Sequence, residues 1–217
     1  MSTTERSELS SLVEDWELKA IVSSTWRDLH RHRAAVQEAC LTARVVPIMM
    51  EHLLPQDVSI VEKSLEMVDQ ADIYIGLFGL RYGTVPAGGD RSVTEIEFDR
   101  AKERRLEKLL FTASERHRPK LAALESTAES RDGLRRLKEQ FASLLTGEFT
   151  SVHDLKFRVL GALEESRRRW LFLELQRALR LLDIERRKGA RRREQLTAVT
   201  ERLKVCEARL GGGASSS

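Results

Sequence analysis

A nearly uninterrupted apolar run, Ala71–Gly79 (ADIYIGLFG), constrains the fold of this chain more than any other segment. A strand with one face in water alternates apolar and polar residues, whereas this run is apolar at almost every position. Such continuity is typical of a strand in a parallel sheet, where helices cover both faces. We therefore predict that Ala71–Gly79 is a central strand of an α/β sheet.

Strand and helix patterns alternate around this run. Further strands are predicted at Glu17–Ser23, Arg44–Met50, Leu109–Ala113 and Glu148–Thr150. Helices are predicted at Trp26–Ala43, at Ser59–Gln70, at Ser92–Arg104 with Ser92 as N-cap, within His117–Leu145, and from His153 onward with Ser151 as cap. Pro47 cannot donate a ladder hydrogen bond, which favours an edge position for its strand. This order predicts right-handed βαβ units and a three-layer, Rossmann-like α/β fold with a mostly parallel sheet, followed by a C-terminal helical extension.

The composition divides the chain into four segments. We predict a polar leader at 1–16, the α/β domain at 17–165, a basic helical extension at 166–210 and a flexible tail at 211–217. The leader lacks the basic start and apolar run of a secretory signal, and the longest apolar run, Ile73–Leu80, is too short to span a bilayer. These features predict a cytoplasmic protein with no membrane partner.

The basic charge is concentrated in one segment. Ser166–Gln195 carries 11 Lys and Arg against 4 Asp and Glu, a balance of +7, whereas the whole chain has +3 and the rest therefore −4. Such a segment can attract nucleic acid or an anionic surface, but a charged helical face is more often solvated. Because no recognised nucleic-acid-reading motif accompanies the arginines, nucleic acid is not an expected partner.

Two apolar patterns follow one another in the extension. The first comprises Leu171, Leu175, Ala178 and Leu182, on one face of a helix that Gly189 and the Arg clusters are expected to interrupt. The second comprises Leu196, Val199, Leu203, Cys206 and Leu210, which have the alternating spacing of a short coiled-coil seam. Two interpretations stand: the helices pack back on their own domain, or they mediate self-association or bind a protein partner.

Several classes of chemistry lack their signatures. Cys40 and Cys206 are far apart and have no spacing typical of metal or redox sites, so we expect reduced thiols and no metal site. The phosphate-binding loop G-x-x-x-x-G-K-[ST] is absent, which excludes an ATPase of that type. No cofactor is predicted to be required.

Ligands of parallel α/β sheets bind at the carboxyl ends of the strands, where the first candidate cluster lies. Ser23, Ser24 and Thr25 follow the first strand at a helix N-terminus, where hydroxyl and backbone N–H groups can hold a phosphate or ribose. Helix capping explains the same residues. Asp28 is a fourth candidate, or simply a first-turn acid favoured by the helix dipole.

The second cluster, Arg81 and Tyr82, follows the predicted central strand. An arginine here can pair with phosphate, and an aromatic ring can stack on a base or nicotinamide. Alternatively, Arg81 forms a salt bridge with a neighbouring helix.

The third cluster, Thr94–Ala101, lies on the next helix. Glu95 and Glu97 are about 200° apart on the helix, so only one can point into a cleft. Thr94 and Ala101 lie on the same side as Glu97, which selects Glu97. A carboxylate there could stabilise a ribosyl cation or attack the anomeric carbon; alternatively, Glu97 is a surface or capping acid.

Together these segments resemble a known family. VSSTWRDL (Val22–Leu29), Arg33, Glu51, ADIYIGLFGLRYG (Ala71–Gly83) and SVTEIEFDRA (Ser92–Ala101) are similar to the domain of unknown function 4062 family, over roughly Lys19–Leu163. The resemblance implies a Rossmannoid domain of the TIR/flavodoxin-like type, often found at the N-terminus of STAND-type NTPases in prokaryotic conflict and signalling systems. It also places Glu51 among the ligand-binding residues.

The segment around Glu97, T-x-x-E-[apolar]-x-x-A, is similar to the catalytic segment of nucleoside deoxyribosyltransferases and NAD-cleaving TIR domains. This likeness implies that Ser23, Ser24 and Thr25 contact ribose or phosphate, that Glu97 acts at the anomeric carbon, and that NAD or a related nucleotide is ligand or substrate. The tryptophan that many TIR domains carry four residues before the glutamate is Val93 here. Two functions are therefore considered: a signalling or effector module that binds a nucleotide or a partner, and an N-glycosidic bond hydrolase.

Overall fold

The computed structural model describes residues 17–52, 58–114, 127–141, 144 and 146–211, with side chains up to residue 201. Its sheet has five parallel strands in the order β2-β1-β3-β4-β5. The chain thus starts near the middle, moves to one edge and returns across the sheet, which is the flavodoxin-like, doubly wound order. The predicted α/β fold with a parallel sheet is confirmed.

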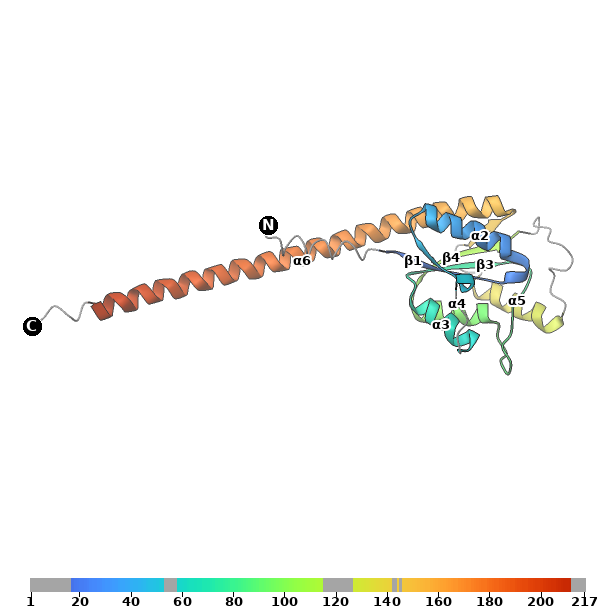
Figure 1. Ribbon diagram of the computed structural model, residues 1–217, viewed down its shortest axis with the longest axis horizontal. Coiled ribbons are helices and arrows are strands. Elements are labelled where there is room, and N and C mark those ends of the chain that lie inside the picture. Colours follow the sequence, from blue (N-terminus) through green and yellow to red (C-terminus); the bar gives the residue numbers. More distant parts are fainter. Residues whose placement is uncertain (1–16, 53–57, 115–126, 142–143, 145, 212–217) are drawn as a thin grey trace, which may run out of the picture. The chain divides into compact units, whose positions relative to one another are not determined.

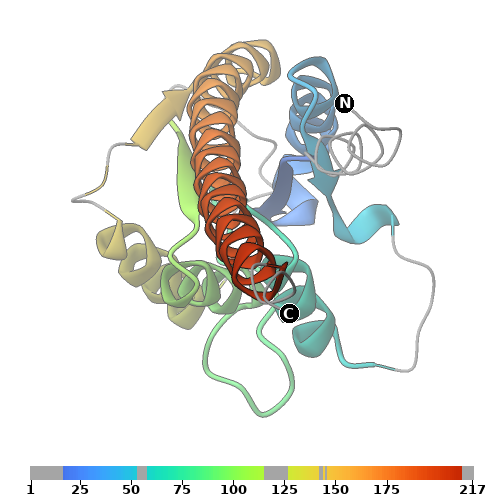
Figure 2. The same cartoon turned by 90° about the vertical axis from the view of Figure 1, so that its left-hand side faces the viewer.

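Helices cover both faces of this sheet (Figures 1 and 2). The strands are β1 (Lys19–Ser24), β2 (Val46–Ile48), β3 (Ile73–Phe78), β4 (Glu107–Ala113) and β5 (Thr146–Phe149). The helices are α2 (Trp26–Thr42), the short 3₁₀ turn η1 (Met50–His52), α3 (Ile60–Asp69), α4 (Val93–Glu103), α5 (Ala128–Gln140) and α6 (Val152–Gly211). The figures show α2 and the beginning of α6 on one side of the sheet, and α3, α4 and α5 on the other. This is the three-layer arrangement that the sequence predicts.

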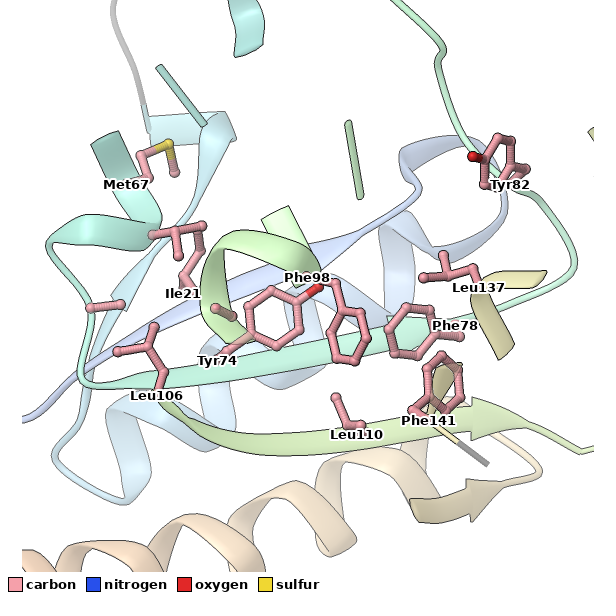
Figure 3. Close-up of a cluster of buried hydrophobic side chains, with 13 residues drawn as sticks. Ile21, Met67, Tyr74, Phe78, Tyr82, Phe98, Leu106, Leu110, Leu137 and Phe141 are labelled. Atoms are coloured by element: carbon pink, nitrogen blue, oxygen red, sulfur yellow. The ribbon is translucent and has the colours of Figure 1, made fainter. Parts of the chain in front are cut away.

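The central strand β3 is buried at every position from Ile73 to Phe78. Successive side chains of a strand point to opposite faces, so Tyr74 and Phe78 lie on one face and Ile73, Ile75 and Leu77 on the other. Tyr74 and Phe78 belong to the core cluster between the sheet and α3, α4 and α5 (Figure 3). The continuous apolar run is therefore explained by a strand that packs on both faces.

Phe98 of α4 lies at the centre of that cluster. Its side chain is fully buried, and its ring centroid is 5.9 Å from that of Tyr74, 6.2 Å from Phe78 and 5.8 Å from Phe141. Tilted and edge-on aromatic contacts at such distances add to the free energy gained from burial. Phe98 thus fixes α4 against β3, which also sets the position of the rest of the helix.

Most element boundaries agree closely with the predicted ones. Ser92 caps α4 by accepting a hydrogen bond from the backbone of Glu95, and Ser151 caps α6 in the same way through Asp154. The strand that contains Pro47 lies at the sheet edge, as predicted. The fifth strand begins earlier than predicted, at Thr146. Of the helix predicted within His117–Leu145, the part before Thr127 lies outside the described residues.

The chain forms two compact units, Met1–Arg168 and Arg169–Ser217. In the first unit, α6 contributes the fully buried Leu155, Val159 and Leu163. The second unit contains the remaining residues of α6. The leader 1–16 and tail residues 212–217 lie outside the described residues.

One local prediction in the extension is wrong. Gly189 and the neighbouring Arg clusters do not interrupt the helix, because α6 is continuous from Val152 to Gly211. A single glycine costs a helix only about 1 kcal/mol relative to alanine. Good helix formers surround it, and pairs such as Arg187–Asp183 and Lys188–Glu185 bridge adjacent turns. Across the described residues, no helix has the length and apolar character needed to span a membrane.

We predict that Phe98→Ala destabilises the first unit by about 3–5 kcal/mol, because it leaves a cavity among three aromatic rings. Urea unfolding of the full chain at constant pH measures this free energy. Phe157→Ala is the matched control, since Phe157 is 74% exposed on α6 of the same unit, and it should change stability by no more than about 0.5 kcal/mol. Equal effects of the two variants would contradict the central role of Phe98.

Candidate functional site

The fold brings α2, η1 and α4 together beside the carboxyl end of β1. Residues from these elements line a cavity of about 480 Å³. Its lining residues are Val22, Ser24, Thr25, Trp26, Arg33, Met50, Glu51, Ile60, Thr84, Val93, Thr94 and Glu97. The cavity thus lies at the edge of the sheet where the carboxyl ends of the parallel strands meet, which is the edge predicted from the sequence.

Glu97 is the buried acid of this cavity. Only 6% of the residue is exposed, and the hydroxyl of Ser23 donates a hydrogen bond of 2.5 Å to its carboxylate. Burial raises the pKa of Glu97 to about 7, although the Ser23 hydrogen bond and the nearby Arg33 charge act in the opposite direction. At neutral pH the carboxyl group is therefore close to half-ionised, and it can take up or release a proton.

Arg33 and Glu51 form the second charged element of the cavity. The guanidinium of Arg33 donates from Nε and Nη2 to the two oxygens of Glu51, at 2.5 and 2.6 Å. Nη1 donates to the carbonyl of Val22 and to the hydroxyl of Ser24, each at 3.0 Å. This bidentate pair joins α2 to η1 and to the end of β1. Burial alone would raise the pKa of Glu51, but Arg33 outweighs that effect and the pKa lies below its usual value.

Thr25 and Asp28 hold the start of α2 against the loop after β3. The Thr25 hydroxyl donates to the carboxylate of Asp28, which also accepts a 3.0 Å hydrogen bond from the backbone N–H of Leu80. A Cβ atom at Gly79 would collide with the same carboxylate, so glycine permits this close approach. Asp28 thus ties two loops together, and it is not among the residues that line the cavity.

Arg81 and Tyr82 are not brought to this cavity. Tyr82 is only 2% exposed, belongs to the core cluster, and donates its hydroxyl hydrogen bond to Glu95. Glu95 also accepts a 3.0 Å hydrogen bond from Gln140. Arg81 is half-buried and lies outside the cavity lining. The predicted joint site of Arg81, Tyr82 and Glu97 is therefore corrected, because the loop after β3 turns Tyr82 into the core.

The prediction that Glu95 and Glu97 face different ways agrees with their partners. Glu95 contacts Tyr82 and Gln140, whereas Glu97 contacts Ser23 and lines the cavity. Thr94 lines the cavity beside Glu97, as their helical spacing requires. Of the other sequence candidates, Ser24, Thr25 and Glu51 also line it, and Ser23 lies behind Glu97.

Arg33 and Trp26 are two of the cavity residues that were not predicted as site residues from the sequence. Arg33 occupies a position in the buried stripe of α2, between Leu29 and Val36, where an apolar residue is expected. A charged residue in such a stripe needs a partner, and this is the signal that could have revealed it. Trp26, 59% exposed at the first position of α2, gave no comparable signal.

Among the residues that the structure describes, no group of three or more His, Cys, Asp and Glu side chains is arranged to hold a metal ion. The acids of the cavity instead engage Ser23 and Arg33. The polar groups that line the cavity are a carboxyl group, hydroxyl groups and a paired guanidinium.

The family described as domain of unknown function (DUF4062) matches residues 19–164, well over half of the chain. The chain belongs to this family. A solved structure, described as the TIR domains of the activated Roq1 resistosome that directly recognizes the pathogen effector XopQ, is similar at 11% identity with a TM-score of 0.38. The similarity covers 70% of this chain and 84% of that one. The comparison with curated proteins gave no match.

We predict that Glu97 makes stability fall as the pH rises. Between pH 4.5 and about 7 the unfolded chain releases the Glu97 proton whereas the folded chain retains it, so this contribution is complete below pH 4.5 and lost by about pH 8. A shift from 4.5 to about 7, at 1.36 kcal/mol per unit, corresponds to about 3 kcal/mol. Urea unfolding of the native protein and Glu97→Gln at pH 4 to 8 should show their stability difference changing by that amount.

Glu103→Gln is the control for this measurement. Glu103 lies on the same helix, but its side chain is 66% exposed. Its stability curve should run parallel to that of the native protein. A pH-independent difference between the native protein and Glu97→Gln would contradict the raised pKa.

Proposed function

We propose that the domain is a signalling or effector module that binds a nucleotide through its ribosyl unit, with Glu97 facing the sugar. The observation that carries this proposal is the buried Glu97 carboxyl group, supported by Ser23 in a cavity of about 480 Å³. That volume lies in the range of small-molecule sites. Moving a carboxylate out of water is costly, so a buried acid that lines a cavity favours a functional role for that residue.

The charges of the cavity favour a sugar over a phosphate at this point. The guanidinium of Arg33 is already paired with both oxygens of Glu51, and Glu97 adds negative charge once ionised. A phosphate group would therefore meet little uncompensated positive charge from these side chains. Ribose hydroxyls are suitable donors to carboxylate oxygens. We infer that Glu97 accepts a hydrogen bond from a ribose hydroxyl, and that Glu51 can accept a further one.

The rim of the cavity suits a planar ring. Trp26 and Ile60 line the cavity and are 59% and 50% exposed. An exposed tryptophan offers an aromatic face on which a purine or nicotinamide ring can stack. With the sugar at Glu97 and the ring at Trp26, one nucleoside unit would span the pocket from its buried end to its rim.

We predict that NAD or adenosine binds the protein and that Glu97→Gln and Trp26→Ala each weaken binding by about tenfold or more. The first variant loses a charged hydrogen-bond acceptor and the second an aromatic contact, each worth about 1.5 kcal/mol or more. Isothermal titration calorimetry with each compound measures the affinity. Glu103→Gln should bind as the native protein does. No binding of either compound, or unaltered binding by both site variants, would exclude this pocket as the nucleotide site.

A second candidate function is hydrolysis of an N-glycosidic bond, and it is favoured by a buried carboxyl group of raised pKa, Glu97, in the lining of the cavity. In this reaction the bond between the anomeric carbon and nicotinamide breaks, and the bonding electrons leave with the nicotinamide nitrogen. Ionised Glu97 would stabilise the resulting ribosyl cation, and water would add its oxygen to the anomeric carbon. The products from NAD are ADP-ribose, nicotinamide and one proton.

If the domain is a hydrolase, nicotinamide release from NAD should increase as the pH rises through about 7, because the ionised form of Glu97 is the active one. Glu97→Gln should reduce the rate at least a hundredfold, whereas Glu103→Gln should leave it unchanged. Chromatography of nicotinamide over time provides the rate. Release that persists in Glu97→Gln would remove Glu97 from the chemistry. Binding without release would support the module that binds but does not cleave.

A further inference from the structure

Two series of positions in the second unit, most of them apolar, share one heptad phase. Leu175, Leu182, Gly189, Leu196, Leu203 and Leu210 are each seven residues apart. A second series with the same spacing is Leu171, Ala178, Glu185, Arg192, Val199 and Cys206, which alternates with the first at intervals of three and four. The two apolar patterns of the extension are therefore halves of one seam, since α6 passes through Gly189 without a break.

This seam is exposed in the single chain. Leu175 is 51% exposed, Leu182 46%, Leu196 62% and Val199 53%. A heptad seam sustained over five or more repeats is typical of a coiled coil, in which the apolar stripe is buried by another helix. A helical partner of similar length would bury these side chains.

The centre of the seam indicates which partner fits. Glu185 and Arg192 occupy seam positions on either side of Gly189. In a parallel pair of identical helices, each of these residues would face its own copy, and like charges would meet twice. In an antiparallel pair with Leu175 opposite Val199, the two-fold axis lies between Glu185 and Gly189. Glu185 of one chain then shares a layer with Gly189 of the other and lies one layer from its Arg192, so neither charge shares a layer with its own copy. An interface that complements itself about a two-fold axis is what a symmetric dimer needs.

Charged residues on either side of the seam also fit an antiparallel pair. When the helices run antiparallel with Leu175 opposite Val199, Glu174 and Arg202 occupy facing flank positions by their place in the sequence. The two copies of Lys188 approach one another near the axis, where each is already paired with Glu185 of its own helix at 2.7 Å. The basic segment beside them is repelled by its copy in either orientation. Salt should therefore strengthen the association through screening.

We propose that α6 pairs with α6 of a second copy of this chain as an antiparallel coiled coil centred near Gly189. The native full chain is then a dimer. Leu175→Asp should raise the dissociation constant at least about a hundredfold, because two buried leucines per dimer become charged. Leu173→Asp is the matched control: Leu173 is 53% exposed but lies outside the seam, and this variant should leave the dissociation constant unchanged. Sedimentation equilibrium of the full chains measures both.

Disulfide cross-linking tests the direction of the helices. In a Cys206→Ser background, Leu175→Cys and Val199→Cys are prepared as separate proteins, mixed, and oxidised. The antiparallel pairing predicts a cross-link between the two different chains and none within either protein alone. Cross-links within each protein alone would establish parallel pairing and overturn the proposal, and so would a native chain that stays monomeric at high concentration and salt.

Discussion

Burial of β3 on both faces is the constraint on which the rest of the domain depends. A strand with apolar side chains on each side needs helices on each side, and parallel neighbours can be reached only by crossover connections. The crossovers in turn place the carboxyl ends of the strands at one edge. The cavity that contains Glu97 is a consequence of this topology, because α2 and α4 both begin near that edge.

The charged residues of the cavity are stable there because each has a specific partner. Arg33 would be costly in the buried stripe of α2, but Glu51, Val22 and Ser24 satisfy its guanidinium. Within the described part of the chain, Glu97 accepts a hydrogen bond from one hydroxyl group, that of Ser23, and burial is the dominant influence on its pKa. The pKa of Glu51, which is paired with Arg33, therefore lies below its usual value, whereas the pKa of Glu97 lies above it.

The second unit obeys a different constraint. A packed domain buries its apolar residues internally, whereas an extended helix exposes its seam unless a partner covers it. In α6 the polar interruption at Glu185 and Arg192 falls at the middle of the seam. Polar residues at such positions weaken a coiled coil but specify its register and direction. Arg192, which belongs to a cluster predicted to interrupt the helix, can therefore contribute to the direction of pairing.

The sequence by itself determined the α/β class, the central position of β3 and the edge position of the Pro47 strand. It also determined that Glu95 and Glu97 point in different directions. These features follow from the residue types and their spacing along short segments, which can be read from the sequence alone. Only the tertiary structure decided that Arg33 enters the cavity and pairs with Glu51, and that Tyr82 leaves it for the core. Those outcomes depend on contacts between segments distant in the chain. The continuity of α6 through Gly189 likewise depends on the whole helix, because its many residues that favour helix formation outweigh the cost of one glycine.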